Sequence, residues 1–189
     1  MAKVEYLTTQ SVLSLISPRG LYVVAYSWLF GMSLWVTFFG GVIAFKALPR
    51  QQFGTLQHKT FPIYFGISIF LSGSMLGYWV FTHPDVASYL AHPTMADVAQ
   101  AYALFAVFGG QSFNKFVIGP LTSETMFRRH RLEKEEGKNY NDPGVSPAMK
   151  SLNRRFGMLH GISSLANLIA VISLGFHGLW IGHTGVGGY

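Results

Sequence analysis

Four long apolar segments constrain this chain more than any other feature of its sequence. They run over about residues 21–48, 61–82, 97–118 and 156–181. A bilayer core about 30 Å thick is crossed by ~20 helical residues, so each segment is long enough to span it. Charged residues make up 12% of the chain, whereas a soluble domain carries about 25%. The sequence therefore predicts an all-α, polytopic membrane protein whose apolar side chains face lipid.

The segments predict one membrane domain over residues 1–189, an antiparallel bundle of four transmembrane helices. Residues 4–17 place Leu7, Val12 and Ile16 near one face, which indicates a short amphipathic helix lying on the membrane surface. The polar side chains in the same stretch argue against a cleavable signal peptide. A long loop over residues 120–155 begins with a charged helix and joins the third and fourth segments.

Basic residues predict the orientation of the bundle. Lys46, Arg50 and Lys59 lie at or near the first loop, and eight more Lys and Arg residues lie in the third loop. The second loop and the tail after residue 181 contain none. Cytoplasmic loops carry an excess of Lys and Arg. We therefore expect loops one and three in the cytoplasm and both termini in the lumen or outside the cell.

Polar residues at membrane depth are the candidate site. Helical spacing directs five of them toward one cavity open to the cytoplasm: Thr37, Asn114, His160, Ser164 and Asn167. Polar groups in a bilayer either bond to one another or line a path. They accordingly either fix the helix packing or form a vestibule for a small solute, ion or lipid headgroup. Lys115 is expected to extend its amine to the cytoplasmic headgroups.

Small residues are expected to mark the inner faces of the helices. Gly66, Gly73 and Gly77 lie on one face of the second segment, and Gly157 and Gly161 form a Gly-x-x-x-Gly pair in the fourth. Helices in lipid associate through close approach at such residues. The pattern predicts which face of each helix points inward, but not which helices contact one another.

Catalytic and metal-binding signals are weak. We find no hydrolase, metalloprotease or phosphate-loop motif, and therefore expect no catalytic residues and no enzyme activity. A metal or haem site is a third interpretation of the polar residues, but His58, His160 and His177 are scattered, so we expect no metal and no cofactor. The basic stretch 128–155 lacks interleaved aromatics, which argues against nucleic acid as a partner. It favours anionic lipid or a docked protein.

Three blocks of the sequence resemble the transmembrane protein 205-like family, whose conserved region is a domain of unknown function. They read WVTFFGG at residues 35–41, FGTLQHKTFPIYF at 53–65 and HGISSLANL at 160–168. The matching positions beyond the polar cluster are Phe61, Pro62, Tyr64 and Gly161. The resemblance implies a four-helix membrane protein with no agreed activity. It also implies residence in an endomembrane, since animal relatives are associated with intracellular membranes, secretory traffic and resistance to platinum drugs.

Two functions remain open from the sequence. The first is a non-enzymatic membrane protein that handles a small solute, metal complex or lipid through the polar cluster. The alternative is a structural or adaptor subunit of a membrane complex, which recruits partners through the basic third loop.

Overall fold

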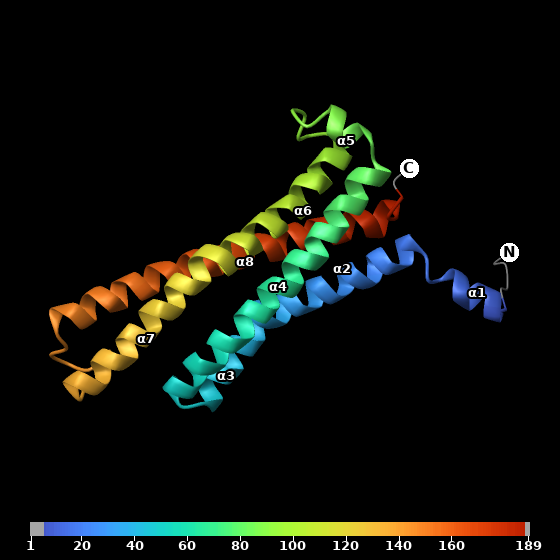
Figure 1. Cartoon of the computed structure of the whole chain (residues 1–189). Coiled ribbons are helices and arrows are strands. Elements are labelled where there is room, and N and C mark those ends of the chain that lie inside the picture. Colours follow the sequence, from blue (N-terminus) through green and yellow to red (C-terminus); the bar gives the residue numbers. More distant parts are fainter. Residues whose placement is uncertain (1–5, 188–189) are drawn as a thin grey trace.

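The computed structural model describes residues 6–187, and long helices dominate this part of the chain (Figure 1). They form four helical segments, which follow one another along the chain. The first contains α2 (Pro18–Leu34), the π-helix η1 (Trp35–Gly40) and α3 (Gly41–Ala47); the second is α4 (Arg50–Thr82); the third contains α6 (Ala96–Phe113), the π-helix η2 (Asn114–Ile118) and α7 (Gly119–Glu136); the fourth is α8 (Pro147–Thr184). Two short helices, α1 (Thr9–Ser14) and α5 (Asp85–Ser88), precede the first segment and follow the second.

Local sequence signals set the ends of these helices. Ser17 caps α2 by accepting a hydrogen bond from the amide of Gly20 at 3.1 Å, and Pro18 follows it at the first helical position. Ser146 and Pro147 repeat this arrangement at the start of α8. A hydroxyl at the cap satisfies an otherwise free amide, and proline has the helical φ already fixed. Gly137 ends α7 with a φ of 63°, a conformation that favours glycine.

Within residues 6–187, three helices are long and apolar enough to cross a membrane: Pro18–Ala47, Arg50–Thr82 and Pro147–Thr184. Their most apolar windows have mean hydropathies of 1.7, 1.4 and 1.6. The predicted crossing at residues 97–118 coincides with α6 and η2, which are not among these three; α6 carries Asp97, Gln100 and Gln111. Gln100 and Gln111 are both fully buried, so these amides face neighbouring helices rather than lipid.

The helices extend beyond the apolar segments from which they were predicted. α4 begins at Arg50 and α8 at Pro147, so most of the predicted 120–155 loop is helical and only residues 137–146 connect α7 to α8. Polar residues continue a helix as readily as apolar ones where the helix leaves the bilayer. α1 is shorter than the predicted amphipathic stretch over residues 4–17, whose first two residues lie outside the described part. Its apolar neighbours Leu7, Leu15 and Ile16 are exposed.

The core lies where all four segments meet. α6 packs against both α4 and α8, and α2 packs against the same two helices. The largest fully buried apolar side chains there include Leu29, Met75, Trp79 and Leu104. Toward the end that carries loops one and three, α3 and the first part of α4 diverge from α7 and the first part of α8 (Figure 1). The bundle is therefore filled at one end and forked at the other.

Glycines permit close contact at some of the predicted positions and not at others. A Cβ at Gly73 would lie 3.2 Å from the Phe108 ring, so this glycine does face a neighbouring helix. The inward orientation predicted for Gly77, Gly157 and Gly161 is wrong. All three are exposed, and beyond the adjacent part of its own helix a Cβ at any of them would meet no atom within 4 Å. The Gly-x-x-x-Gly spacing indicates a helix surface that another helix could approach closely. In this structure α8 packs against its neighbours through other residues.

We predict that Gly178→Ala destabilises the bundle, because a Cβ there would lie 1.7 Å from the hydroxyl oxygen of Tyr26. That hydroxyl donates to the Leu174 carbonyl at 3.1 Å and so joins α2 to α8. We expect a loss of about 1–3 kcal/mol, typical of overpacking, measured by thermal unfolding in detergent. Gly175→Ala is the control, since a Cβ there meets nothing within 4 Å. Equal unfolding temperatures for the two variants would contradict this packing.

Candidate functional site

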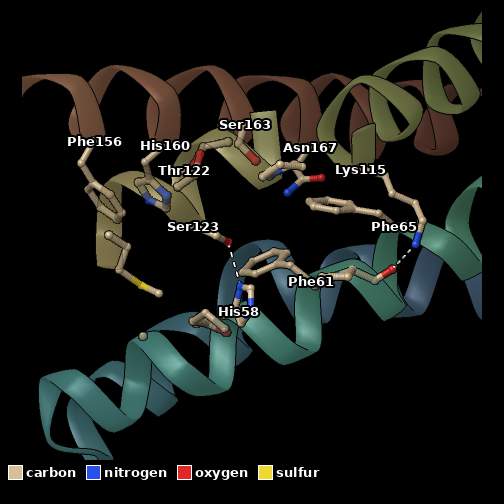
Figure 2. Close-up of a pocket in the computed structure, with 18 of the residues that line it drawn as sticks. His58, Phe61, Phe65, Lys115, Thr122, Ser123, Phe156, His160, Ser163 and Asn167 are labelled. Atoms are coloured by element: carbon tan, nitrogen blue, oxygen red, sulfur yellow. Dashed lines mark hydrogen bonds between the residues drawn. The ribbon is translucent and has the colours of Figure 1, made fainter. Parts of the chain in front are cut away.

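A cavity of about 790 Å³ occupies the fork between the two diverging helix pairs. η1, α3 and the first half of α4 form one wall, and η2, α7 and α8 form the other. Figure 2 shows His160 and Asn167 projecting from α8, with Phe61 projecting from α4 on the facing side. Lys115 and Phe156 lie at opposite ends of the labelled set. The cavity exists because the helices separate here instead of packing as they do in the core.

Aromatic side chains form much of the apolar lining. Six phenylalanines contribute from four different helical elements: Phe53, Phe61, Phe65, Phe116, Phe127 and Phe156. Ligand cavities in proteins are typically apolar, with a few placed polar groups that orient what they bind. The polar lining groups of this cavity are therefore the ones that would orient a ligand and determine which ligand binds.

Four of the five polar residues predicted from helical spacing line the cavity. Thr37 enters from η1, and His160, Ser164 and Asn167 enter from α8. Asn114 lies behind the wall, fully buried, and donates from Nδ2 to the Ser163 carbonyl at 3.3 Å. The structure thus brings these residues into one region, with Asn114 supporting the wall instead of facing the cavity.

The four other positions of the family motifs have different surroundings. Phe61 and Pro62 line the cavity. Tyr64 is buried in the bundle, where its hydroxyl makes hydrogen bonds. Gly161 is exposed on α8 and is not part of the lining. A motif match in the sequence therefore covers cavity, core and surface positions at once.

Two π-helical turns flank the cavity. η1 contains Thr37, and η2 contains Asn114 and Lys115. In η2 the amide of Gly119 bonds to the carbonyl of Asn114, and a Cβ at Gly119 would lie only 2.7 Å from that oxygen. Such turns are rare and occur frequently at functional sites. The sequence patterns used for prediction assume a regular helical period and did not detect either turn.

Lys115 directs its amine toward α4. Its Nζ donates to the Pro62 carbonyl at 2.7 Å, in an exposed contact that joins η2 to α4 at one end of the cavity (Figure 2). The extension of this amine to the headgroups stays a prediction. Gly66 makes room for this amine, because a Cβ there would lie 3.1 Å from Nζ. A backbone carbonyl oxygen has two lone pairs, so the Pro62 oxygen can accept from Lys115 in addition to a helical amide. The sequence shows both residues but not their contact.

Histidines occupy both sides of the cavity. His58 Nδ1 and Ser123 Oγ are 2.9 Å apart, which joins α4 to α7 (Figure 2). The His58 ring also meets Phe127 edge-on, with centroids 5.0 Å apart. On α8, the His160 ring stacks on Phe156 at 5.9 Å with an interplanar angle of 7°. These rings are held by aromatic neighbours and present nitrogen atoms within an otherwise apolar wall.

A buried polar layer lies next to the cavity and connects all four helical segments. The Gln111 amide donates from Nε2 to Asn167 Oδ1 at 3.1 Å and to the Tyr64 hydroxyl at 3.4 Å. Tyr64 in turn donates to Ser33 Oγ at 3.3 Å. Asn167 belongs to both the layer and the cavity lining. Helical spacing indicated Asn167 and the family motif indicated Tyr64, but neither signal showed that Gln111 joins them.

Several polar atoms near this layer lack a protein partner. Thr37 Oγ1, Gln111 Oε1 and Asn114 Oδ1 are buried without a hydrogen bond to another residue. Buried polar atoms are usually satisfied by protein, water or ligand. The polar layer and the wall next to it therefore retain unused hydrogen-bonding capacity, with Thr37 as the lining residue among the three.

A second buried cluster lies at the opposite end of the bundle. His177 Nδ1 is 2.9 Å from Gln100 Oε1, so this nitrogen donates, and Nε2 accepts from the Tyr22 hydroxyl at 2.6 Å. The three residues come from α8, α6 and α2. The sequence considered His177 only as a metal ligand and so missed this contact, whose partners are distant in sequence. Within residues 6–187 no group of three or more His, Asp or Glu side chains is placed to hold a metal.

Charged side chains close the forked end beyond the cavity. Arg50 at the start of α4 forms an ion pair with Glu133 of α7 and lies 3.7 Å above the Tyr140 ring. Arg129 lies over the same ring at 4.4 Å and over Phe156 at 4.5 Å. Burial lowers the pKa of the Arg129 guanidinium, and the positive charge of Arg50 lowers it further. Part of the basic third loop thus stabilises the fold.

Comparison with known proteins places the chain among membrane proteins. A family model described as Domain of unknown function (DUF4149) matches residues 24–131. Transmembrane protein 205 from Danio rerio is 27% identical over 162 residues, which are 79% of this chain and 82% of that protein. An Uncharacterized protein from Aquifex aeolicus (strain VF5) is 40% identical over 50 residues, which are 26% of this chain and 38% of that protein. No solved structure gives a significant match.

We predict that Gln111→Leu destabilises the bundle, because it removes the donor shared by Asn167 and Tyr64. An interhelical hydrogen bond in a membrane protein contributes about 0.6 kcal/mol on average and up to about 1.7 kcal/mol, and because Gln111 makes two of them we expect a loss of about 1–2 kcal/mol in denaturant unfolding in mixed micelles. Gln52→Leu removes an exposed amide from α4 and is the matched control. Surface changes of this kind stay within about 0.5 kcal/mol. Similar losses for both variants would show that the layer contributes nothing specific.

Proposed function

The chain belongs to the transmembrane protein 205-like family, and from this premise we propose that it is a non-enzymatic membrane protein that binds a small amphiphile in the forked cavity. Its shared region is a domain of unknown function, so the family supplies the membrane setting and not the activity. The proposal therefore rests on the chemistry of the cavity.

The observation that carries the proposal is the mixed lining of one 790 Å³ space. Six phenylalanine rings offer an apolar surface, while Thr37, His160 and Asn167 offer polar atoms on the same walls. A purely apolar solute would leave those polar atoms desolvated, and a purely polar one would leave the rings unused. A molecule with both characters matches the lining best.

We propose four membrane crossings, with α6 and η2 forming the third. α6 lies between α4 and α8, and its glutamines are buried there, whereas its Phe105 and Phe113 are exposed. A helix that packs among others does not need a uniformly apolar surface to remain in a bilayer. This arrangement has both termini on the non-cytoplasmic face and the cavity in the cytoplasmic half. By family resemblance we place the protein in an endomembrane.

The geometry of the titratable groups supports a binding function over catalysis. His58 and Ser123 are within hydrogen-bond reach, which is the spacing of a base and a nucleophile. Such a pair is normally completed by a group that orients the histidine. Among the described residues no carboxylate bonds to His58, and the lining carboxylate of Glu124 is engaged by Arg128 at 2.6 Å. The His58–Ser123 contact is therefore assigned to holding α4 against α7.

The adaptor function raised by the sequence stays a prediction. Arg50 and Arg129 contact Tyr140 inside the fold and are not displayed to a partner. Exposed basic residues such as Arg131, Lys134 and Lys150 remain on the surface. No observed feature of this surface specifies a protein partner, so the cavity is the better supported site.

We predict that single cysteines at Lys138 and Gln52 react from the cytoplasmic side, whereas a cysteine at Ala91 reacts only from the opposite side. All three positions are exposed, and the natural chain contains no cysteine, so each variant carries one label. The measurement is labelling of sealed vesicles by a membrane-impermeant maleimide before and after permeabilisation. Equal accessibility of positions 138 and 91 in sealed vesicles would overturn the four-crossing topology.

We predict that a photoactivatable lipid bearing a diazirine in its acyl chain labels lining residues of the protein in vesicles. Ser164→Trp should reduce this labelling severalfold by filling the cavity, since Ser164 is a lining residue on α8. Ile172→Trp introduces the same ring at an outward-facing position of the same helix and should leave the labelling unchanged. Peptide mapping by mass spectrometry gives the readout. Identical patterns for both variants would disprove the proposed binding site.

A further inference from the structure

The ammonium group of Lys115, which has no ion-pair partner among the described residues, indicates which class of ligand the cavity binds. This inference rests on the proposed function. We propose that the cavity selects an anionic lipid, with its carboxylate or phosphate head at Lys115 and its chain among the phenylalanine rings. The ligand class is thus an amphiphile with a single acidic head, not a neutral or zwitterionic one.

The charge of Lys115 lacks a carboxylate partner. The two ion pairs found within residues 6–187 join Arg50 to Glu133 and Arg128 to Glu124, and neither involves Lys115. Lys115 is half-buried in η2 and directly follows the buried Asn114. A cation at this depth is unfavourable unless it pairs or reaches water. An anionic head in the cavity would supply the missing counter-charge.

The hydrogen bonding of the ammonium group leaves room for such a head. A lysine amine has three N–H donors. One donates to the Pro62 carbonyl at 2.7 Å, which fixes Nζ at the edge of the cavity (Figure 2). The remaining donors are not used by other residues of the described chain and so are available to oxygen atoms of a ligand. Hydrogen bonds from a charged donor to a charged acceptor are the stronger kind.

The other charged lining group does not offset Lys115. Glu124 belongs to the cavity lining, but its Oε1 accepts from Arg128 at 2.6 Å on the exposed face of α7. The carboxylate of Glu124 is thus matched by Arg128, and Lys115 is the charged lining residue left without an opposite charge among the described residues. An anion is favoured over a cation or a zwitterion by this arrangement.

Aromatic residues next to Lys115 accommodate the apolar part of the ligand. Phe65 faces the same end of the cavity as Lys115 in Figure 2, and Phe61 continues the apolar surface along α4. Phe116 follows Lys115 in η2 and is 69% exposed, so the cavity adjoins the surface expected to face lipid. A chain can therefore extend from the ammonium along these rings toward the bilayer.

The test compares three photoactivatable lipids on the full-length protein in vesicles of neutral lipid. Phosphatidic acid and oleate carry a phosphate and a carboxylate head, and phosphatidylcholine is the zwitterionic control. We expect roughly tenfold stronger labelling of lining peptides by at least one acidic lipid, the effect of one charged hydrogen bond. Labelling by only one of the two acidic lipids identifies the preferred head. Equal labelling by all three would overturn the anionic selection while leaving the cavity proposal intact.

Variants assign the effect to Lys115. Lys115→Gln should reduce labelling by acidic lipid to the level of phosphatidylcholine, and Lys115→Arg should largely retain it. Lys46→Gln removes an exposed charge at the end of α3, outside the lining, and is the matched control. An equal loss in the two Gln variants would refute a specific role for Lys115. Absence of lining labels with every lipid would refute the proposed function itself, and the wild-type comparison decides the selection even where a variant fails to fold.

Discussion

The interhelical hydrogen bond between the amides of Gln111 and Asn167 is the interaction on which the arrangement of the bundle depends. Lipid provides no hydrophobic drive for helices to associate, so close packing and polar contacts must hold them together. Together with the hydrogen bonds from Gln111 to Tyr64 and from Tyr64 to Ser33, this bond connects all four helical segments at one level of the bundle. On one side of it the helices converge on a core that contains Leu29 and Trp79. On the other side they diverge, and the cavity begins.

The cavity and the closing contacts at the forked end are two results of the same divergence. Arg50 and Glu133 meet across the gap that the helices leave, and Tyr140 lies beneath the Arg50 guanidinium. These residues hold the two helix pairs at a fixed separation without filling the space between them. The space remains bounded by phenylalanine rings and a few polar atoms, which is the composition expected of a site for an amphiphile.

Much of this arrangement was predictable from the sequence, and the exceptions share a physical cause. Hydrophobic length identified the helices, and the 3.6-residue period directed Thr37, His160 and Asn167 to one region. The same period could not show that Lys115 reaches the Pro62 carbonyl, or that His177 lies between Tyr22 and Gln100. Those contacts depend on how helices that are far apart in the sequence are rotated against one another. The inward orientation expected for Gly157 and Gly161 was wrong for a related reason: a short motif describes one helix surface and not its neighbour. The polarity of α6 was visible, but the burial that makes it compatible with a bilayer was not.

The two π-helical turns have a geometric consequence for the parts of the chain that follow them. Each successive α-helical residue advances about 100° around the axis, so a wide turn that accommodates an extra residue resets the direction of every later side chain. η1 precedes α3, and η2 precedes α7. The extra residue in each π-helical turn therefore sets the direction in which Gly41 of α3 and Ser123 of α7 face the cavity. The residues of α3 and α7 themselves do not set it.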